Sequence, residues 1–401
     1  MSKFIKAVSD PRGFVKDALT NVRSLNDLRQ RVAEARKTDK KVAVLVGFST
    51  WKTWMRDYLP DHEVVFLGHS PRVSERLLKE IPNLGNIEVF AWSYKYPVAL
   101  EKICSDAGIP LTFVEDGWIR SFGLGAMKST PMSLVFDKKA MHFDRSGTSE
   151  LEDILKTHDF DTDELLMSRA RKMIEELKSG QVSKYNGLGE DMDLRKHFGL
   201  GPRQNCVLVI GQVEDDLSLA YGMERPMSGN ELVLRAAMEN PGSIILYRPH
   251  PESRAVRKKH YSNPEDVSHF AFIAPEEASL HACFNVAKKV YSMTSLAGFE
   301  AALHGLPVKT FGCPFYAGWG FTEDVDPVAK ARKRELTAQE VFAAAYILYA
   351  RYWDPVTGKR IKAEEALKSI SVVRRHADRI SKITTKRVEA AEAAPTLLAA
   401  E

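Results

Sequence analysis

The sequence has few cysteines and no long apolar run, and these two absences exclude several classes of protein. Its four cysteines, Cys104, Cys206, Cys283 and Cys313, lie far apart and form no CxxC pair, so neither a zinc site nor a disulfide framework is expected. No stretch of about eighteen apolar residues occurs, and the N-terminus lacks an apolar signal core. We therefore expect a soluble cytoplasmic chain with free thiols.

Two nucleotide-binding signatures are also missing. No predicted strand is followed by GxGxxG, since FGLGAM (122–127) has two glycines of that motif and lacks the third. GxxxxGK[ST] does not occur either. Neither a dinucleotide cofactor nor an ATP phosphate cradle is therefore expected, and we predict no cofactor and no nucleic-acid partner.

The charge is small but unevenly distributed. The net charge of the whole chain is +4, whereas residues 1–40 hold ten Lys or Arg and five Asp or Glu, a local excess of +5. One interpretation is a peripheral contact with anionic lipid, at the cytoplasmic face of the inner membrane, or with an acidic partner. The other, which we favour, is a solvated helical extension with a basic face.

What the sequence does contain is a regular alternation of strand and helix patterns. In the first half, short apolar runs predict strands at 41–48, 63–68, 87–93 and 110–117. Helices are predicted between them: one begins at Ser49 or Thr50, and another spans 97–108 and is closed by Gly108. A charged helical stretch at 149–180 and the segment 180–191 are interpreted as a connector.

A second series follows the connector. Strands are predicted at 206–212, 243–249, 287–293 and 307–312, with helices near 229–239 and 296–305. The pattern predicts an α/β fold of two Rossmann-like domains facing a cleft, with C-terminal helices that cross both domains. The expected segments are a basic helical extension (1–40), a first Rossmann-like domain with its connector (41–195), a second Rossmann-like domain (196–330), helices (331–388) and an Ala-rich linker or tail (389–401), after which the chain is expected to continue into a further module.

Polar residues follow three successive strands of the second series. Glu214-Asp215-Asp216 follow the first strand, His250 follows the next between Pro249 and Pro251, and Thr294-Ser295 precede a helix that carries Glu300. Each group alone has an ordinary explanation, such as a solvated loop or a helix N-cap. Because parallel sheets bind ligands beyond the carboxyl ends of their strands, their recurrence predicts one shared site.

This set of side chains suits a single phosphate group. A histidine, hydroxyls and the amides of a helix N-terminus can hold one phosphate without a metal ion, and Glu300 is placed to accept hydrogen bonds from a ribose. A nucleoside monophosphate sugar therefore fits better than a diphosphate sugar. An opposing interpretation treats Glu214 and Asp216 as a metal-binding pair.

Five motifs are distinctive: EDGWIRSFGLG (115–125), GQVEDDLS (211–218), YRPHPE (247–252), SMTSLAGFEAALHGLPVKTFGCPFYAGWGFTED (292–324) and YARYWDP (349–355). Together they resemble the retaining β-Kdo transferases of bacterial capsule and O-antigen assembly, enzymes with a fold of the GT-B type. The resemblance covers about residues 90–360, with residues 41–195 on the acceptor side, residues 196–330 as the CMP-sugar-binding domain, and a further catalytic module expected after this chain. It implies transfer of Kdo, an acidic ketose, from CMP-Kdo to an oligosaccharide or lipid-linked glycan in lipopolysaccharide O-antigen or capsule assembly.

The resemblance also implies roles for individual residues. His250, Ser292, Thr294 and Ser295 would contact the CMP phosphate, Glu300 would hold the ribose, and Gln212 and Arg248 would complete the donor site; Asp116 would face them across the cleft. Retention needs a carboxylate nucleophile or same-face attack. We assign the nucleophile to Asp216 and the acceptor proton to Asp116 or Glu115. The alternatives are an inverting CMP-sugar transferase of sialyltransferase type and a non-catalytic glycan- or nucleotide-sugar-binding module.

Overall fold

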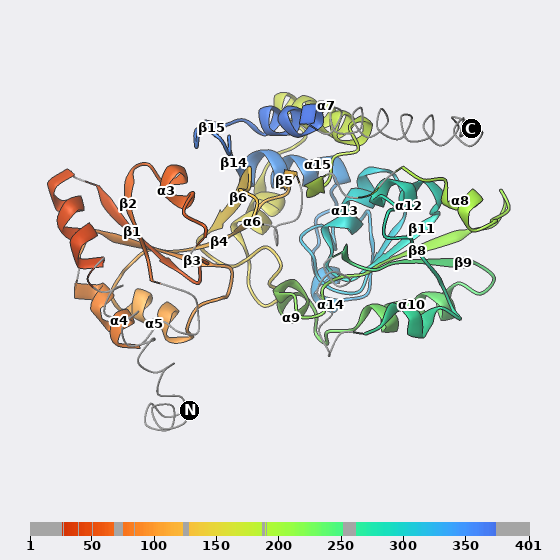
Figure 1. The fold of residues 1–401 in the computed structure, drawn as a ribbon, viewed down its shortest axis with the longest axis horizontal. Helices are drawn as coiled ribbons and strands as arrows, with labels where there is room; N and C mark the ends of the chain where they lie inside the picture. The colour runs from red at the N-terminus through yellow and green to blue at the C-terminus, as the bar shows by residue number, and fades with distance from the viewer. Residues whose placement is uncertain are drawn as a thin grey trace, which may run out of the picture.

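The computed structural model describes residues 26–373, apart from 27, 39, 50, 68–74, 84, 123–127, 187, 188, 190 and 252–261. Strands and helices alternate and build two large sheets, one in each half of the molecule (Figure 1), and β5 (Ser121–Phe122) pairs with β7 (Tyr185–Asn186) in a separate two-stranded sheet. This confirms the expected α/β class with two Rossmann-like halves. Residues 1–25 of the predicted basic extension and the Ala-rich segment 389–401 lie outside the described residues.

The first sheet has seven strands among the described residues, in the order β15-β14-β6-β4-β3-β1-β2. Strands β2, β1, β3 and β4 pair in parallel, and β6, β14 and β15 extend the sheet with antiparallel pairs. Their bounds are β1 Lys41–Val46, β2 His62–Phe66, β3 Ile87–Trp92, β4 Leu111–Asp116, β6 Ser133–Asp137, β14 Arg351–Trp353 and β15 Arg360–Ile361. The strands predicted before residue 118 are all confirmed.

The second sheet is entirely parallel, with described strands in the order β10-β9-β8-β11-β12-β13. Its bounds are β8 Cys206–Ile210, β9 Ile244–Arg248, β10 Phe272–Ile273, β11 Lys289–Ser292, β12 Val308–Thr310 and β13 Glu323–Asp324. All five residues of β8 are buried, as expected for a central strand covered on both faces. The four strands predicted in this half are confirmed.

Helices cover both sheets. In the first half and the connector they are α3 Met55–Tyr58, α4 Glu75–Glu80, α5 Ala99–Asp106, α6 Glu150–Thr157 and α7 Glu164–Ser179. In the second half they are α8 Leu194–His197, α9 Leu217–Gly222, α10 Gly229–Glu239, α12 Leu280–Val286, α13 Leu296–Leu303 and α14 Pro327–Lys330. Short 3₁₀ turns lie at Ile81–Asn83 and Pro264–Val267. Of the helices that the structure describes, none is both long and apolar enough to cross a bilayer.

The predicted helix start at Ser49 or Thr50 is wrong. Helix α3 begins only at Met55, after turns in which the N–H of Lys52 donates to the carbonyl oxygen of Ser49. Trp54 occupies the N-cap position without a side-chain cap, and it is buried against the first sheet together with Met55. Burial of these two large side chains therefore sets the local backbone, in place of the hydroxyl cap that the sequence suggested.

The predicted C-terminal helix also ends too late. Helix α15 (Ala338–Phe342) passes into a π-helical turn at Ala343–Tyr349, and the chain then forms the strand β14. Tyr352 and Trp353 are buried in this strand, which pairs with β6, a strand that we did not predict. The segment 331–388, expected to be helical, thus supplies two strands to the first sheet.

Part of the N-terminal extension belongs to the folded core. Residues 28–38 are helical, and Leu28, Val32 and Ala35 are buried in the same apolar cluster as strand β1. Most of the other positions of the helix are exposed, including the basic residues Arg29, Arg36 and Lys37. The expected solvated extension is therefore wrong for these residues, because one face of the helix packs against the first half.

The C-terminal helices cross between the two halves, as expected. Helix α15 packs against α13 of the second half and α7 of the connector. The indole Nε1 of Trp118 donates to the carbonyl oxygen of Ala345 at 2.9 Å, and the hydroxyl of Tyr349 donates to Asp137 at 2.9 Å. Ala343, Ala344 and Ala345 are fully buried, so small side chains allow this close approach.

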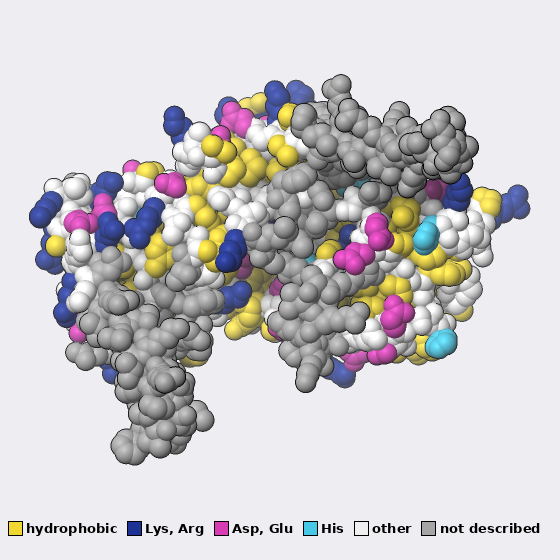
Figure 2. All heavy atoms as spheres, viewed as in Figure 1, with side chains coloured by type: hydrophobic (Ala, Val, Ile, Leu, Met, Phe, Trp, Pro, Cys, Tyr) yellow, Lys and Arg dark blue, Asp and Glu magenta, His cyan; other side chains and the backbone are white. Residues whose placement is uncertain are grey.

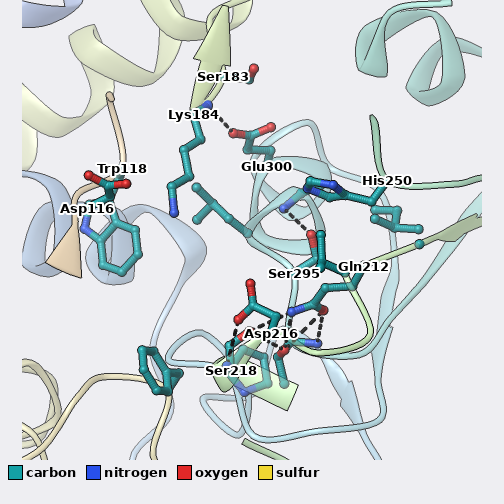
Figure 3. A pocket seen from close by; sticks show the side chains of 18 of the residues that line it. Asp116, Trp118, Ser183, Lys184, Gln212, Asp216, Ser218, His250, Ser295 and Glu300 are labelled. Atoms are coloured by element: carbon teal, nitrogen blue, oxygen red, sulfur yellow. Dashed lines mark hydrogen bonds between the residues drawn. The ribbon is translucent and has the colours of Figure 1, made fainter. Parts of the chain in front are cut away.

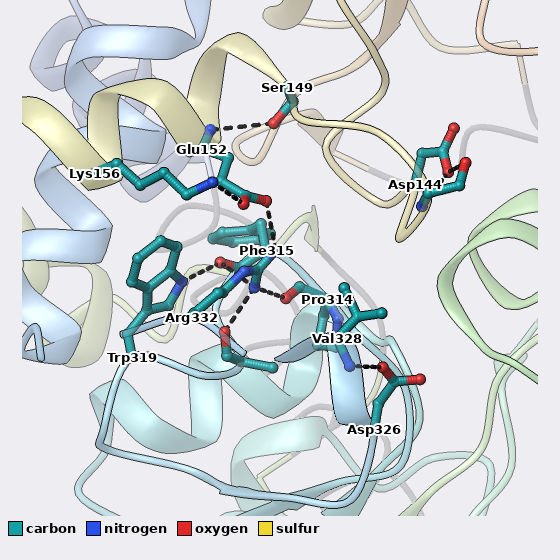
Figure 4. Close-up of polar contacts among 12 residues, drawn as sticks. Asp144, Ser149, Glu152, Lys156, Pro314, Phe315, Trp319, Asp326, Val328 and Arg332 are labelled. Atoms are coloured by element: carbon teal, nitrogen blue, oxygen red, sulfur yellow. Dashed lines mark hydrogen bonds and ion pairs between the residues drawn. The ribbon is translucent and has the colours of Figure 1, made fainter. Parts of the chain in front are cut away.

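Arg332 joins the two halves through a buried ion pair (Figure 4). Its side chain is 7% exposed, and its Nη2 lies 2.9 Å from a carboxylate oxygen of Glu152 in α6. Its Nη1 donates to the carbonyl oxygens of Pro314 and Ala317 at 3.0 and 2.6 Å. The guanidinium also lies over the ring of Trp319. One side chain thus anchors the loop 314–321 to the connector.

Candidate active site

A cavity of about 480 Å³ lies between the two sheets, at the carboxyl ends of their central strands. Nine of the ten predicted site residues line it; they are Glu115, Asp116, Gln212, Asp216, Arg248, His250, Thr294, Ser295 and Glu300. Figure 3 shows Asp116 and Trp118 on one side of this cavity and Gln212, His250 and Ser295 on the other. Residues that are far apart in the sequence therefore meet in one place.

His250 reaches the cavity from a turn that directly follows β9. Gly211, at the end of the neighbouring strand β8, donates its N–H to the carbonyl oxygen of Arg248 at 2.8 Å. A Cβ at Gly211 would lie 2.9 Å from Cα of Pro249 and 3.1 Å from the nitrogen of His250, so this glycine permits the close approach of the turn. Burial lowers the pKa of His250 to about 4. At neutral pH the imidazole is therefore uncharged and offers one N–H donor.

The side chain of Gln212 makes hydrogen bonds to other residues of the protein. Its Nε2 donates to Ser218 at 2.7 Å and to Thr294 at 2.9 Å. Its Oε1 accepts from the backbone N–H of Thr294 at 3.3 Å. The side chain thereby ties the loop after β8 to the loop after β11. Gln212 and Thr294 line the cavity, but this network gives them a positioning role.

Two of the three acidic residues in the loop after β8, Asp216 and Glu214, have different partners. Asp216 is the N-cap of α9, its carboxylate accepts from the N–H of Ser218 at 2.8 Å, and the residue is exposed toward the cavity. Glu214 instead accepts from the N–H of Gly229 at 3.3 Å and from Ser262. Since Glu214 serves to hold the start of α10, the two carboxylates do not form a pair.

The acidic pair on the first half consists of two unlike carboxyl groups. Asp116 forms an ion pair with the buried Arg120 at 2.7 Å, and its second oxygen has no hydrogen-bond partner among the described residues. Although burial opposes it, Arg120 together with Lys52 and Lys184 holds the pKa of Asp116 below its usual value. Burial and the adjacent Asp116 charge raise the pKa of Glu115. The pair thus combines an ionised carboxylate with a group that can carry a proton.

Glu300 and Ser295 lie on the helix that enters the cavity from the second half. Ser295 caps the N-terminus of α13. Glu300 is 3% exposed, accepts from the N–H of Lys184 at 3.2 Å, and has a pKa raised to about 8 by burial. Ser292 is the predicted residue that the structure does not bring to the cavity. It is fully buried, and its hydroxyl lies 3.4 Å from that of Tyr316.

The chain matches a known protein family and known relatives. A family model described as capsule polysaccharide biosynthesis protein matches residues 88–352. The chain belongs to the capsule polysaccharide biosynthesis protein family. It is 34% identical to the lipopolysaccharide-processing protein LpsZ of Rhizobium meliloti, over 84% of this chain and 76% of LpsZ. It is 33% identical to the capsule polysaccharide modification protein LipA of Neisseria meningitidis, over 82% of this chain and 46% of LipA, so it spans about half of LipA.

Two solved structures share the fold of this capsule-family chain. The β Kdo 2,7 transferase of Thermosulfurimonas dismutans KpsC is 29% identical, with a TM-score of 0.66, over 83% of this chain and 100% of that one. The β Kdo 2,4 transferase of the same KpsC is 29% identical, with a TM-score of 0.68, over 82% of this chain and 97% of that one. The resemblance inferred from the motifs is thereby confirmed at the level of the family and the fold.

Sequence reasoning missed three residues of this capsule-family site: Lys184, Trp118 and His142. Lys184, in the segment interpreted as a connector, extends into the cavity from the boundary of the two halves (Figure 3). Trp118 and His142 line the wall on the side of the first half, and Phe315 packs against Trp118 with ring centroids 4.6 Å apart. Burial lowers the pKa of His142 to about 3, so it is neutral. Only Trp118 and Phe315 lay within recognised motifs; an isolated lysine in a short loop has no local signature.

We predict that activity does not depend on a divalent metal ion. The metal-binding interpretation needs Glu214 and Asp216 to bind one ion together. In the structure the carboxylate of Glu214 instead accepts hydrogen bonds from Ser262 and Gly229. Glycosyl transfer by this chain should therefore survive excess EDTA. Loss of turnover that Mg²⁺ or Mn²⁺ specifically restores would contradict this prediction.

Proposed function

We propose that this chain is a retaining glycosyltransferase that transfers Kdo from CMP-Kdo to a saccharide acceptor in polysaccharide assembly. The observation that carries the proposal is the division of the cavity: hydrogen-bond donors suited to one phosphate lie on the second half, and a carboxyl pair faces them from the first. The two KpsC structures that share this fold are both β-Kdo transferases, which supports Kdo as the transferred sugar. The relatives LpsZ and LipA support a polysaccharide context.

The donor nucleotide would bind to the second half. His250, Ser295 and the N-terminus of α13 line the cavity together, and Arg248 adds a positive charge beside them. Backbone amides at a helix N-terminus favour an anion, so the CMP phosphate would lie there. Because Glu300 holds a proton near neutral pH, it can donate to a ribose oxygen as well as accept from one. A phosphate held in this way is stabilised as it leaves.

The transfer itself would use two carboxyl groups. We propose that Asp216 attacks the anomeric carbon as CMP leaves, which inverts the configuration once. The acceptor hydroxyl would then displace Asp216 with a second inversion, giving net retention. Asp116 or Glu115 would take the acceptor proton. Burial and the charge of Asp116 raise the pKa of Glu115, which makes it a stronger base than an ordinary carboxylate, whereas an oxygen of Asp116 has no hydrogen-bond partner among the described residues.

The test of the proposed function is the structure of the product. Purified protein is incubated with CMP-Kdo and a capsule or O-antigen oligosaccharide, and the anomeric configuration and linkage are read by NMR. Retention of the donor's configuration supports the proposal. Inversion would indicate a transferase of the sialyltransferase type, and CMP-Kdo that is bound but unchanged would indicate a binding module.

We predict that His250→Ala weakens the binding of CMP. The imidazole lies in the donor half of the cavity, and loss of a hydrogen bond to a charged group costs about 1.5–3 kcal/mol. Turnover should fall further, because the phosphate gains charge as it leaves. Calorimetry with CMP measures the first effect, and His197→Ala, an exposed histidine of the second half, is the control. If the variant had normal thermal stability and unchanged CMP affinity, the turn that carries His250 would have a purely structural role.

A further inference from the structure

Lys184 lies where the two halves of the cavity meet, and both halves fix its backbone. Its N–H donates to the carboxylate of Glu300 at 3.2 Å, and its carbonyl oxygen accepts from the N–H of Arg120 at 3.3 Å. The two residues after it form strand β7 (Tyr185–Asn186), which pairs in parallel with β5 (Ser121–Phe122) of the first half. The backbone of this lysine is therefore held at the boundary, and its side chain extends into the cavity (Figure 3).

The fixation continues on both sides of Lys184. Asn186 is fully buried, and its amide donates to the carbonyl oxygens of Ser121 and Ser183 at 3.2 and 2.8 Å. The side-chain oxygen of Asn186 accepts from the N–H of Ser183 at 3.0 Å. A loop residue tied down by this many bonds presents its side chain at a defined place, as a binding residue must.

The charge of Lys184 acts across the whole cavity. Its ammonium group interacts electrostatically with Glu115 and Asp116 on the first half and with Glu300 and His250 on the second. Lys184 is one of three cations, with Arg120 and Lys52, that lower the pKa of Asp116. Asp116 already has Arg120 at 2.7 Å, and burial raises the pKa of both Glu115 and Glu300, which favours their neutral forms.

We infer that Lys184 binds the carboxylate carried by the anomeric carbon of the donor sugar, and so selects acidic ketose donors over neutral sugars. The inference rests on the proposed function. In such a donor the phosphate and the carboxylate are attached to the same carbon, and that carbon must lie between the nucleotide site and the acceptor base. A cation for the carboxylate therefore has to lie at the boundary of the two halves, where Lys184 is.

The other cavity-lining cations are placed differently. Arg248 ends strand β9 beside His250, on the side proposed for the phosphate. Lys95 is exposed and follows strand β3 of the first half, away from the donor nucleotide. A donor with two negative groups near one carbon would be repelled by Asp216 unless a cation lay beside each of the two groups. Arg248 would neutralise the phosphate, and Lys184 would neutralise the carboxylate.

The test compares two ligands that differ by the acidic sugar. Affinities of CMP and CMP-Kdo are measured by calorimetry for the wild-type chain, Lys184→Met, Lys184→Arg and the control Lys95→Met. Lys184→Met keeps the backbone N–H that donates a hydrogen bond to Glu300, so the loop should stay in place. We expect its Kd for CMP-Kdo to rise at least about tenfold, the equivalent of about 1.4 kcal/mol, with CMP affinity within about twofold of the wild type.

The remaining variants show whether Lys184 binds the carboxylate or the phosphate of the donor. Lys184→Arg should recover much of the CMP-Kdo affinity, and Lys95→Met, at another lysine of the cavity, should lower the affinity for CMP-Kdo much less than Lys184→Met does. Wild-type affinity of Lys184→Met for CMP-Kdo would overturn the inference, and equal losses for CMP and CMP-Kdo would assign Lys184 to the phosphate instead. A wild-type chain that binds CMP-Kdo no better than CMP, with no turnover, would overturn the proposed function itself.

Discussion

Asp216→Asn is expected to lower the rate of Kdo transfer at least about a thousandfold while leaving CMP binding intact. The substitution removes the negative charge that would attack the anomeric carbon and keeps the size of the side chain. It also preserves the start of α9, because Asn caps a helix as well as Asp does, and Asp216 is the N-cap residue there. A loss of rate would therefore report on chemistry and not on a damaged helix. Initial rates and CMP calorimetry measure the two effects.

A covalent adduct would identify the nucleophile directly. Incubation of the wild-type chain with CMP-Kdo, without acceptor, should leave a Kdo-sized mass increment on the peptide that contains Asp216. Asp215→Asn is the matched control, since Asp215 lines the same cavity one residue away. An increment on the peptide that contains Asp116 would reverse the two proposed roles, and near-normal turnover in Asp216→Asn would eliminate this nucleophile.

Arg332→Met is expected to destabilise the fold by about 3 kcal/mol, the lower end of the cost of breaking a buried ion pair. The variant leaves the carbonyl oxygens of Pro314 and Ala317 without their donor. Glu152 keeps a second partner, Lys156, at 2.7 Å, which limits the cost. Thermal unfolding followed by circular dichroism should show a fall of roughly 5–10 °C. Lys333→Met, which removes an exposed charge next to it, should be close to neutral.

The effect of Arg332→Met should also depend on pH in a defined direction. Although burial opposes it, Arg332 and Lys156 hold the pKa of Glu152 below its usual value. The stabilisation is therefore fully present above the unfolded pKa of about 4.3 and is lost as the pH falls through the lower folded value. The stability difference between wild type and variant should shrink below about pH 4. A difference that is constant from pH 7 to pH 3 would show that the ion pair contributes little.

Local patterns predicted most of the parallel strands, and long-range pairing explains what they missed. Apolar runs such as 206–212 are buried strands whatever their neighbours, and Gly108 closes its helix with a φ of +63°. Strand β14 is different, because its segment fits a helical pattern equally well. It becomes a strand by pairing with β6, more than 200 residues earlier in the chain, and nothing within the segment itself contains that information.

The candidate site was predictable to the extent that it follows strand ends. His250, Asp216 and Ser295 follow β9, β8 and β11, so the alternation of elements alone brought them together. Ser292 was misassigned because it is still inside β11, where its side chain packs against Tyr316. Lys184 was missed because its position depends on bonds to Glu300 and Arg120 from opposite halves, which no local pattern reveals.

The return of the chain to its first sheet bears on the order of synthesis and folding. Strand β6 is made early, yet its partner β14 is made only after the entire second sheet. During translation at about 5–20 residues per second, β6 would stay an unpaired edge for roughly 10–40 s, a condition that favours wrong pairing between chains. The second half can fold on the ribosome before the first is complete. Slowing elongation within 138–350 should therefore increase aggregation of the nascent chain, and a peptide that pairs with β6 should reduce it.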